Sequence, residues 1–134
     1  MQRAENNAFD PTRQIWNRLE SLETTGHEIT KCDVRIIGGT WSNYPQEYQE
    51  DYITQVYEAH TNYPVRDTPL PTPDLETAKQ RNETAASRVI GIAIETRPDW
   101  IDETEILRLR HYGVTRVEIG YQTTIDRINA MNKR

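Results

Sequence analysis

The sequence predicts an α/β fold in which parallel strands are separated by helices. Residues 34–37 and 89–94 are short apolar runs rich in valine and isoleucine, as in buried strands. The segments around them carry apolar residues at helical spacing. Strands separated by helices pair in parallel through right-handed crossovers, so this order predicts a parallel sheet covered by helices.

The first half of the chain contains two expected helices and one strand. Asp10 followed by Pro11 predicts a helix start, and Gly26 predicts its end. The apolar positions of this helix are Ile15, Leu19 and Leu22. A second helix is expected from Pro45. Its apolar stripe is Tyr48, Tyr52, Val56 and Ala59, with Ile53 beside it.

A surface loop and a third helix are expected next. Residues 60–73 contain four prolines and little periodicity, which predicts a loop. Thr72 and Pro73 can start a helix that runs to about Ser87.

The run at residues 89–94 is the clearest strand, and both of its faces are apolar. Alternation places Ile90, Ile92 and Ile94 on one face, where they can pack against helices. The other face carries smaller residues that leave room inside: Val89, Gly91 and Ala93, followed by Glu95.

The last third predicts a helix, a strand and a final helix. Asp102 with Glu105 resembles a capping box, and Gly113 can end that helix. Its expected buried residues are Ile106, Leu109 and Tyr112. Residues 114–121 predict a strand, and Thr123 can cap a last helix that contains Ile125 and Ile128.

Composition limits the classes of function. The 134 residues suffice for one domain, and 35% hydrophobic residues make a lean core for a closed barrel, which suggests a part of something larger. A net charge of -5 argues against a chain that grips nucleic acid over its whole surface. Cys32 is the only cysteine, so the chain has no internal disulfide and no cysteine-based metal site. We expect a cytoplasmic protein with no membrane-spanning segment.

Polar or backbone-exposing residues follow each expected strand. Ligands of parallel α/β folds bind beyond the carboxyl ends of the strands. Gly38 and Gly39 would let a ligand approach the backbone, and Glu95 could accept hydrogen bonds from an amine or hydroxyls. Glu118 and Gln122 are expected on one face of the third strand, that of Gly120.

Each of these features also has a purely structural interpretation. The glycine pair can be a plain turn. Glu95 can form a salt bridge with Arg97 or Arg116. Gln122 can be a loop side chain whose amide is hydrogen-bonded within the protein.

Taken together, the segments resemble the radical S-adenosylmethionine domain of the Elongator protein 3 family. The matching stretches run nearly from end to end: Arg3-Ala4, Asp10-Pro11, Gly26-His27, Lys31, Gly38-Gly39-Thr40, Pro45-Gln46-Glu47-Tyr48, Ile94-Glu95-Thr96-Arg97-Pro98-Asp99, Thr115-Arg116-Val117-Glu118-Ile119-Gly120 and Asn132-Lys133-Arg134.

The resemblance implies a partial (β/α) barrel, like an incomplete TIM barrel, that occupies residues 1–134 as a single domain. It implies S-adenosylmethionine and a [4Fe-4S] cluster as cofactors, and acetyl-CoA as a co-substrate. The family's reaction forms carboxymethyl-type groups at C5 of wobble uridine 34 in tRNA, so tRNA is the implied partner.

The resemblance also assigns roles to individual residues. Gly38, Gly39 and Thr40 match the glycine motif that meets the methionyl part of S-adenosylmethionine. Glu95 and Gln122 stand where related barrels contact that cofactor, and Lys31 aligns with a lysine that contacts acetyl-CoA. Arg97 and Glu118 are further candidates from the same strand ends.

The chain also departs from the family. The three cluster cysteines would lie upstream of the Arg3-Ala4 match, and Cys32 falls outside that motif. The barrel closure and the acetyltransferase domain are also absent. We therefore expect the isolated chain to be catalytically inactive. Its open sheet edges predict poor stability or self-association.

Three interpretations of function remain. The chain can be a fragment of a tRNA-modifying radical S-adenosylmethionine acetyltransferase. It can instead be a non-catalytic, degenerate barrel module that binds tRNA or docks on a complete Elongator-type subunit. It can also be another radical S-adenosylmethionine enzyme, but the run Glu95-Thr96-Arg97-Pro98-Asp99 argues against this.

Overall fold

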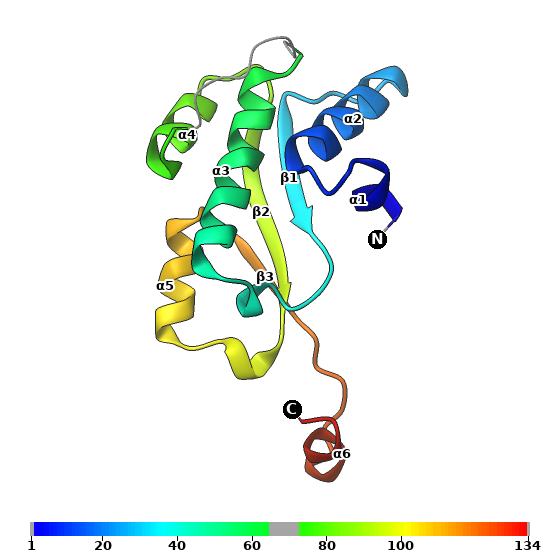
Figure 1. The fold of residues 1–134 in the computed structure, drawn as a ribbon, viewed down its shortest axis with the longest axis vertical. Helices are drawn as coiled ribbons and strands as arrows, with labels where there is room; N and C mark the ends of the chain where they lie inside the picture. The colour runs from blue at the N-terminus through cyan, green and yellow to red at the C-terminus, as the bar shows by residue number, and fades with distance from the viewer. Residues whose placement is uncertain (1, 65–72, 134) are drawn as a thin grey trace.

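The computed structural model describes residues 2–64 and 73–133. Its centre is a parallel sheet of three strands, β1 (Lys31–Ile36), β2 (Arg88–Thr96) and β3 (Arg116–Ile119), in the order β1-β2-β3. The predicted α/β class with parallel strands is therefore confirmed. All three strands end toward the same edge, which is the lower edge in Figure 1.

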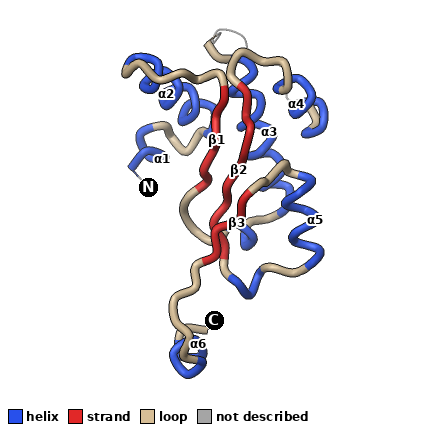
Figure 2. Tube along the Cα trace, turned by 180° about the vertical axis from the view of Figure 1, so that it is seen from behind, coloured by secondary structure: helices blue, strands red, loops and turns tan. Residues whose placement is uncertain are grey.

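Helices cover one face of this sheet and leave the other face open. The described helices are α1 (Gln2–Asn6), α2 (Pro11–Thr24), α3 (Gln46–Asn62), α4 (Leu75–Asn82), α5 (Glu103–His111) and α6 (Asp126–Met131), with single 3₁₀ turns η1 (Trp41–Asn43) and η2 (Pro98–Trp100). Seen from behind, the three strands lie in front with no helix over them (Figure 2). None of the described helices is long and apolar enough to cross a membrane.

Two of the predicted helix starts are confirmed by their hydrogen bonds. Asp10 accepts from the backbone N–H of Arg13 at 2.9 Å, and Asp102 accepts from that of Glu105 at 2.8 Å. Of the predicted start at Thr72 and Pro73, Thr72 lies outside the described residues, and Pro73 is not helical. Asp74 caps α4 instead, because its carboxylate accepts from the Thr77 N–H at 2.9 Å. That helix ends at Asn82, five residues before the expected end.

The long helix α3 is rotated from the predicted stripe. Ile53, Val56 and Ala59 are buried as expected, but Tyr48 is 47% exposed. Gln49 is buried in its place, because its amide nitrogen donates a hydrogen bond to the Tyr44 carbonyl oxygen in the preceding loop. The helix also continues to Asn62, so the predicted loop at residues 60–73 begins too early, and residues 65–72 of it lie outside the described part.

The alternation predicted for β2 fails at its start. Cys32 pairs with Val89 and Asp33 pairs with Gly91, so Ile90 is an extra residue in the register between the strands. Ile90 is consequently 58% exposed, and Val89 packs against the core instead. Ile92 and Ile94, beyond the irregularity, face the helices as predicted and are buried.

The C-terminal elements are shorter and more exposed than predicted. β3 covers only Arg116–Ile119 of the expected strand at residues 114–121. Ile106, Ile125 and Ile128 are exposed, whereas Leu109 and Tyr112 are buried as expected. α6 lies apart from the rest of the fold in both views (Figures 1 and 2). The main core therefore forms between β2, α3, α4 and α5, from residues that include Ile53, Tyr57, Leu75, Ile92, Ile94, Leu109 and Tyr112.

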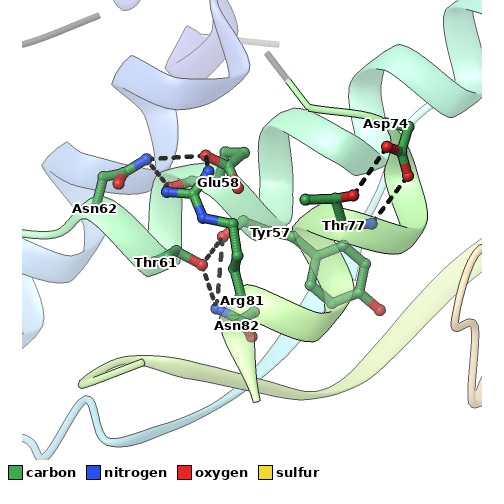
Figure 3. A network of polar contacts seen from close by, with 8 residues as sticks. All are labelled: Tyr57, Glu58, Thr61, Asn62, Asp74, Thr77, Arg81 and Asn82. Atoms are coloured by element: carbon green, nitrogen blue, oxygen red, sulfur yellow. Dashed lines mark hydrogen bonds and ion pairs between the residues drawn. The ribbon is translucent and has the colours of Figure 1, made fainter. Parts of the chain in front are cut away.

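Asn82 connects three elements of this core through one buried side chain. Its amide nitrogen donates to the Tyr57 carbonyl oxygen at 3.4 Å, to Thr61 Oγ1 at 3.1 Å and to the Ser87 carbonyl oxygen at 3.1 Å. Its carbonyl oxygen accepts from the Val89 N–H at 2.7 Å. The contacts with α3 are drawn in Figure 3. Asn82 thus fixes the end of α4 against α3 and against the start of β2.

An ion pair beside Asn82 links the same two helices. Arg81 Nη1 on α4 lies 3.0 Å from Glu58 Oε2 on α3, and the Asn62 amide donates to the same oxygen at 3.2 Å (Figure 3). This group is more exposed than Asn82, so we expect it to contribute less to stability.

Replacing Asn82 by alanine should lower the free energy of unfolding by about 2–4 kcal/mol, because buried donors and acceptors lose their partner. Urea unfolding measures the change. Asn62→Ala is the matched control, since it removes the same amide from the half-buried end of the network, and it should cost less than about 1 kcal/mol. Equal losses for the two variants would contradict the role assigned to Asn82.

The buried imidazole of His60 should make stability depend on pH. His60 is 3% exposed, and burial lowers its pKa, against a smaller raising effect of the Nδ1 hydrogen bond with the Val56 carbonyl oxygen. The unfolded state therefore binds a proton, below about pH 6.5, that the folded state does not. Stability should fall as the pH falls through that value, by up to about 1.4 kcal/mol per pH unit from this group.

Urea unfolding at pH 7.5 and pH 5.5 measures this loss. His60→Gln should reduce the difference between the two pH values, whereas His27→Gln, which removes an exposed imidazole, should leave it in place. A difference that is unchanged in His60→Gln would refute the assignment.

Candidate functional site

The carboxyl edge of the sheet brings the glycine turn beside the end of β2. Gly38 and Gly39 follow β1 with φ values of 119° and 68°, a region of the backbone that favours glycine. A Cβ atom on Gly39 would lie 3.0 Å from the Tyr44 hydroxyl oxygen, so a side chain would also be crowded here. Thr40 completes the turn before η1. The backbone of Gly38 is thus open, with no atom within 4 Å of where a Cβ would lie, whereas the Tyr44 ring packs beside Gly39.

Glu95 is an unpaired carboxylate next to this turn. It lies in β2 one residue before the strand end, is exposed, and has no hydrogen-bond or ion-pair partner within residues 2–64 and 73–133. The structural alternative, a salt bridge to Arg97 or Arg116, is therefore wrong. Arg97 donates instead to Asp99 at 2.8 Å and 2.6 Å and to the Lys133 carbonyl oxygen at 2.6 Å.

Glu118 is engaged by cations, in contrast to Glu95. The two residues are register partners on neighbouring strands, so their side chains leave the same open face of the sheet. Arg35 on β1 donates to Glu118 through Nε at 3.1 Å and also through Nη2. Arg116 Nε lies 3.5 Å from the other carboxylate oxygen of Glu118. The edge therefore holds one neutralised carboxylate and one free one.

These ion pairs cross the central strand, and sequence reasoning missed them. Arg116 also bonds Asp33 on β1, at 3.2 Å, over the small residues of β2. A Cβ on Gly91 would lie 3.0 Å from Asp33 Oδ1, so glycine leaves room for this pair. The sequence did contain a signal, because each outer strand carries an acidic and a basic residue two positions apart: Asp33 with Arg35, and Arg116 with Glu118. Which acid pairs with which base could be assigned only once the register of the strands was known.

Gln122 does not lie where simple alternation would put it, and Lys31 lies far from the glycine turn. β3 ends at Ile119, so Gln122 belongs to the irregular segment that follows, and the prediction that it shares a strand face with Glu118 is wrong. Lys31 begins β1 and is exposed, at the opposite end of that strand from the glycine turn. Lys31 and Glu95 therefore lie at opposite ends of the parallel strands.

Cys32 faces the helices and not the open face. Its Sγ donates to the Ile29 carbonyl oxygen at 3.3 Å and lies 3.5 Å from Ser87 Oγ. It also borders a cavity of about 360 Å³ between α2, β1 and α3, whose other lining residues include Leu19, Val34, Tyr52 and His60. This cavity is on the helix side of the sheet and contains none of the predicted ligand residues. Within the described ranges, no group of three or more His, Cys, Asp or Glu side chains could hold a metal ion.

Comparison with known proteins identifies one family. No protein-family profile matches the chain. The chain is 38% identical over 126 residues to the tRNA uridine(34) acetyltransferase of Methanocaldococcus jannaschii, a match that covers 94% of this chain and 22% of the relative. It is 33% identical over 118 residues to Elongator complex protein 3 of Saccharomyces cerevisiae, covering 88% of this chain and 20% of that protein.

A solved structure agrees with these matches. The archaeal Elp3 of Methanocaldococcus infernus with an N-terminal deletion superposes with a TM-score of 0.83 at 38% identity, over 95% of this chain and 28% of that one. The chain spans about a fifth of the length of the two curated relatives above. By sequence and by fold, this chain is thus a homologue of one segment of the tRNA uridine(34) acetyltransferase and Elongator complex protein 3 family.

Proposed function

We propose that this chain supplies the S-adenosylmethionine-binding wall of a tRNA-modifying acetyltransferase. The enzyme would use acetyl-CoA to form carboxymethyl-type groups at C5 of wobble uridine 34. The names of the relatives support the class of reaction. The observation that carries the proposal for this chain is the free Glu95 carboxylate near the glycine turn with its open Gly38 backbone, at the edge where parallel α/β folds bind ligands.

The residues at this edge fit the polar part of S-adenosylmethionine. Backbone N–H groups of Gly38, Gly39 and Thr40 can serve a carboxylate, and Glu95 can accept from the amine or from ribose hydroxyls. No atom lies within 4 Å of where a Cβ on Gly38 would be, which supports a close approach of ligand to the backbone there. Gln122 would contribute an amide that both donates and accepts. When bound, the cofactor supplies an adenosyl group and a sulfonium-activated methionine.

The chain does not fit the [4Fe-4S] cluster that the family implies. It has a single cysteine, and Cys32 directs its sulfur to Ile29 and Ser87 on the helix side. A cluster would need further thiolates. We therefore derive no step through a cluster for these residues and assign them only to binding and orienting the cofactor.

Lys31 is proposed as the contact for acetyl-CoA. Its ammonium is exposed and has no ion-pair partner among the residues that the structure describes. A free ammonium can pair with the phosphates of coenzyme A. Lys31 lies at the amino end of β1 and the glycine turn at its carboxyl end. Acetyl-CoA and S-adenosylmethionine would therefore approach opposite ends of the strands.

The Glu95 assignment predicts a loss of S-adenosylmethionine affinity. Glu95→Gln keeps the shape of the side chain and removes the charge, so the dissociation constant measured by isothermal titration calorimetry should rise at least about tenfold. Glu28→Gln removes an equal charge from the exposed segment before β1 and is the matched control, with affinity expected to stay unchanged. A wild-type chain that does not bind S-adenosylmethionine would refute the proposed function itself.

A second candidate is a non-catalytic barrel module that binds tRNA or docks on a complete Elongator-type subunit. The single cysteine motivates it, because these residues alone offer no set of cluster thiolates. Self-association through the open edges of β1 and β3 is a further expectation of this candidate.

The tRNA version of this second candidate predicts measurable binding in spite of the net charge of -5. Fluorescence anisotropy of labelled tRNA should rise with chain concentration at about 50 mM salt and fall as salt is added. A tRNA with cytidine at position 34 is the control for recognition of the wobble base. No binding at low salt would exclude the tRNA module, and co-sedimentation with a complete relative would then test docking.

A further inference from the structure

A buried hydrogen bond joins the glycine loop to the strand that carries Glu95. The Thr96 hydroxyl donates to Ser42 Oγ at 2.9 Å, across 54 positions of the chain, and both side chains are buried. Ser42 lies in η1, two residues after Thr40. Within the described ranges, this is the one hydrogen bond between residues 38–45 and β2.

Gln49 holds the same loop from the other side. Its side chain is fully buried in α3, and its amide nitrogen donates to the Trp41 carbonyl oxygen at 3.2 Å and to the Tyr44 carbonyl oxygen at 2.8 Å. The loop is therefore attached to α3 by Gln49 and to β2 by Ser42. Only the second attachment reaches the strand of Glu95.

The packing around this loop leaves some hydrogen-bonding capacity unused. Trp41 Nε1 and Gln49 Oε1 are buried and have no hydrogen-bond partner among the residues described. Each such atom costs about 1–3 kcal/mol of desolvation.

Thr96 and Glu95 are consecutive and point to opposite faces of β2. Thr96 is buried on the helix side, and Glu95 is exposed on the open face. A movement of the Thr96 backbone must therefore move Glu95 as well. The bond from Thr96 to Ser42 therefore links the backbone that carries Glu95 to the loop that contains the glycine turn.

We propose that Ser42 and Thr96 are positioning residues, whose mutual hydrogen bond holds the turn formed by Gly38, Gly39 and Thr40 at a fixed distance from Glu95. The identity of the ligand rests on the proposed function, but the positioning itself does not. Without the bond, the backbone donors of the turn and the Glu95 carboxylate would no longer be pre-organised for one ligand.

Thr96→Val tests the proposal, because it removes the hydroxyl and keeps the shape. Thr115→Val is the matched control: its hydroxyl also hydrogen-bonds β2, through the Ile92 N–H at 3.2 Å, but away from the carboxyl edge. Hydrogen exchange of the 134-residue chain is measured at the Asn43 and Tyr44 amides, which donate within the loop to Thr40 and Trp41.

Thr96→Val should speed exchange of these two amides by about tenfold and weaken S-adenosylmethionine binding at least about fivefold. Thr115→Val should leave both at wild-type values. Thr96→Ser, which restores the hydroxyl, should recover both. Ser42→Ala removes the partner from the loop side and should reproduce the effect of Thr96→Val, also in the event that Thr96→Val fails to fold.

The outcomes separate this inference from the proposed function. Equal loop exchange in Thr96→Val, Thr115→Val and wild type would overturn the positioning role, whatever binds. If the wild-type chain does not bind S-adenosylmethionine but Thr96→Val still loosens the loop selectively, the proposed function fails and the positioning role stands. If Thr96→Val loosens the loop but leaves the affinity intact, the bond does not position the ligand groups and the inference is wrong.

Discussion

The buried amide of Asn82 is the interaction on which the arrangement of this fold most depends. It bonds the backbone of α3, the segment before β2 and the start of β2 itself. β2 is the central strand, so its placement sets the register of both neighbours. The position of Glu95 relative to the glycine turn, some seven residues further along the strand, follows from that register. A polar group in the core thus places the start of the strand whose other end carries Glu95.

The open face of the sheet imposes a second constraint, which is one of charge. The positive charges of Arg35 and Arg116 neutralise the carboxylates of Asp33 and Glu118. These long side chains can meet across β2 because Gly91 and Ala93 on that strand are small. Within this group of described residues, Glu95 carries the one carboxylate that no cation neutralises. A cationic group on a ligand would therefore find its counter-charge at the carboxyl edge and not over the middle of the sheet.

The sequence predicted the order of elements well and the faces of those elements less well. Capping signals are local, so Asp10 and Asp102 could be assigned from neighbouring residues. The exposure of Ile90 and Tyr48 could not be predicted in this way. Ile90 is exposed by an irregularity in strand pairing and Tyr48 by the rotation of α3, and both depend on tertiary structure. At the site, Glu95 and the glycine turn were predictable from strand ends. Which of Glu95 and Glu118 forms ion pairs could not be predicted, because it depends on which arginines the strand register brings near each carboxylate.

The ion pairs over the uncovered face also have a consequence for solubility. An exposed sheet surface of apolar side chains would adhere to other proteins, whereas alternating charges keep a surface hydrated. The ion pairs therefore keep charged groups over the middle of this face, whereas Ile90, at the irregularity in β2, is 58% exposed. The two outer strands add unpaired backbone groups that remain available to a partner strand.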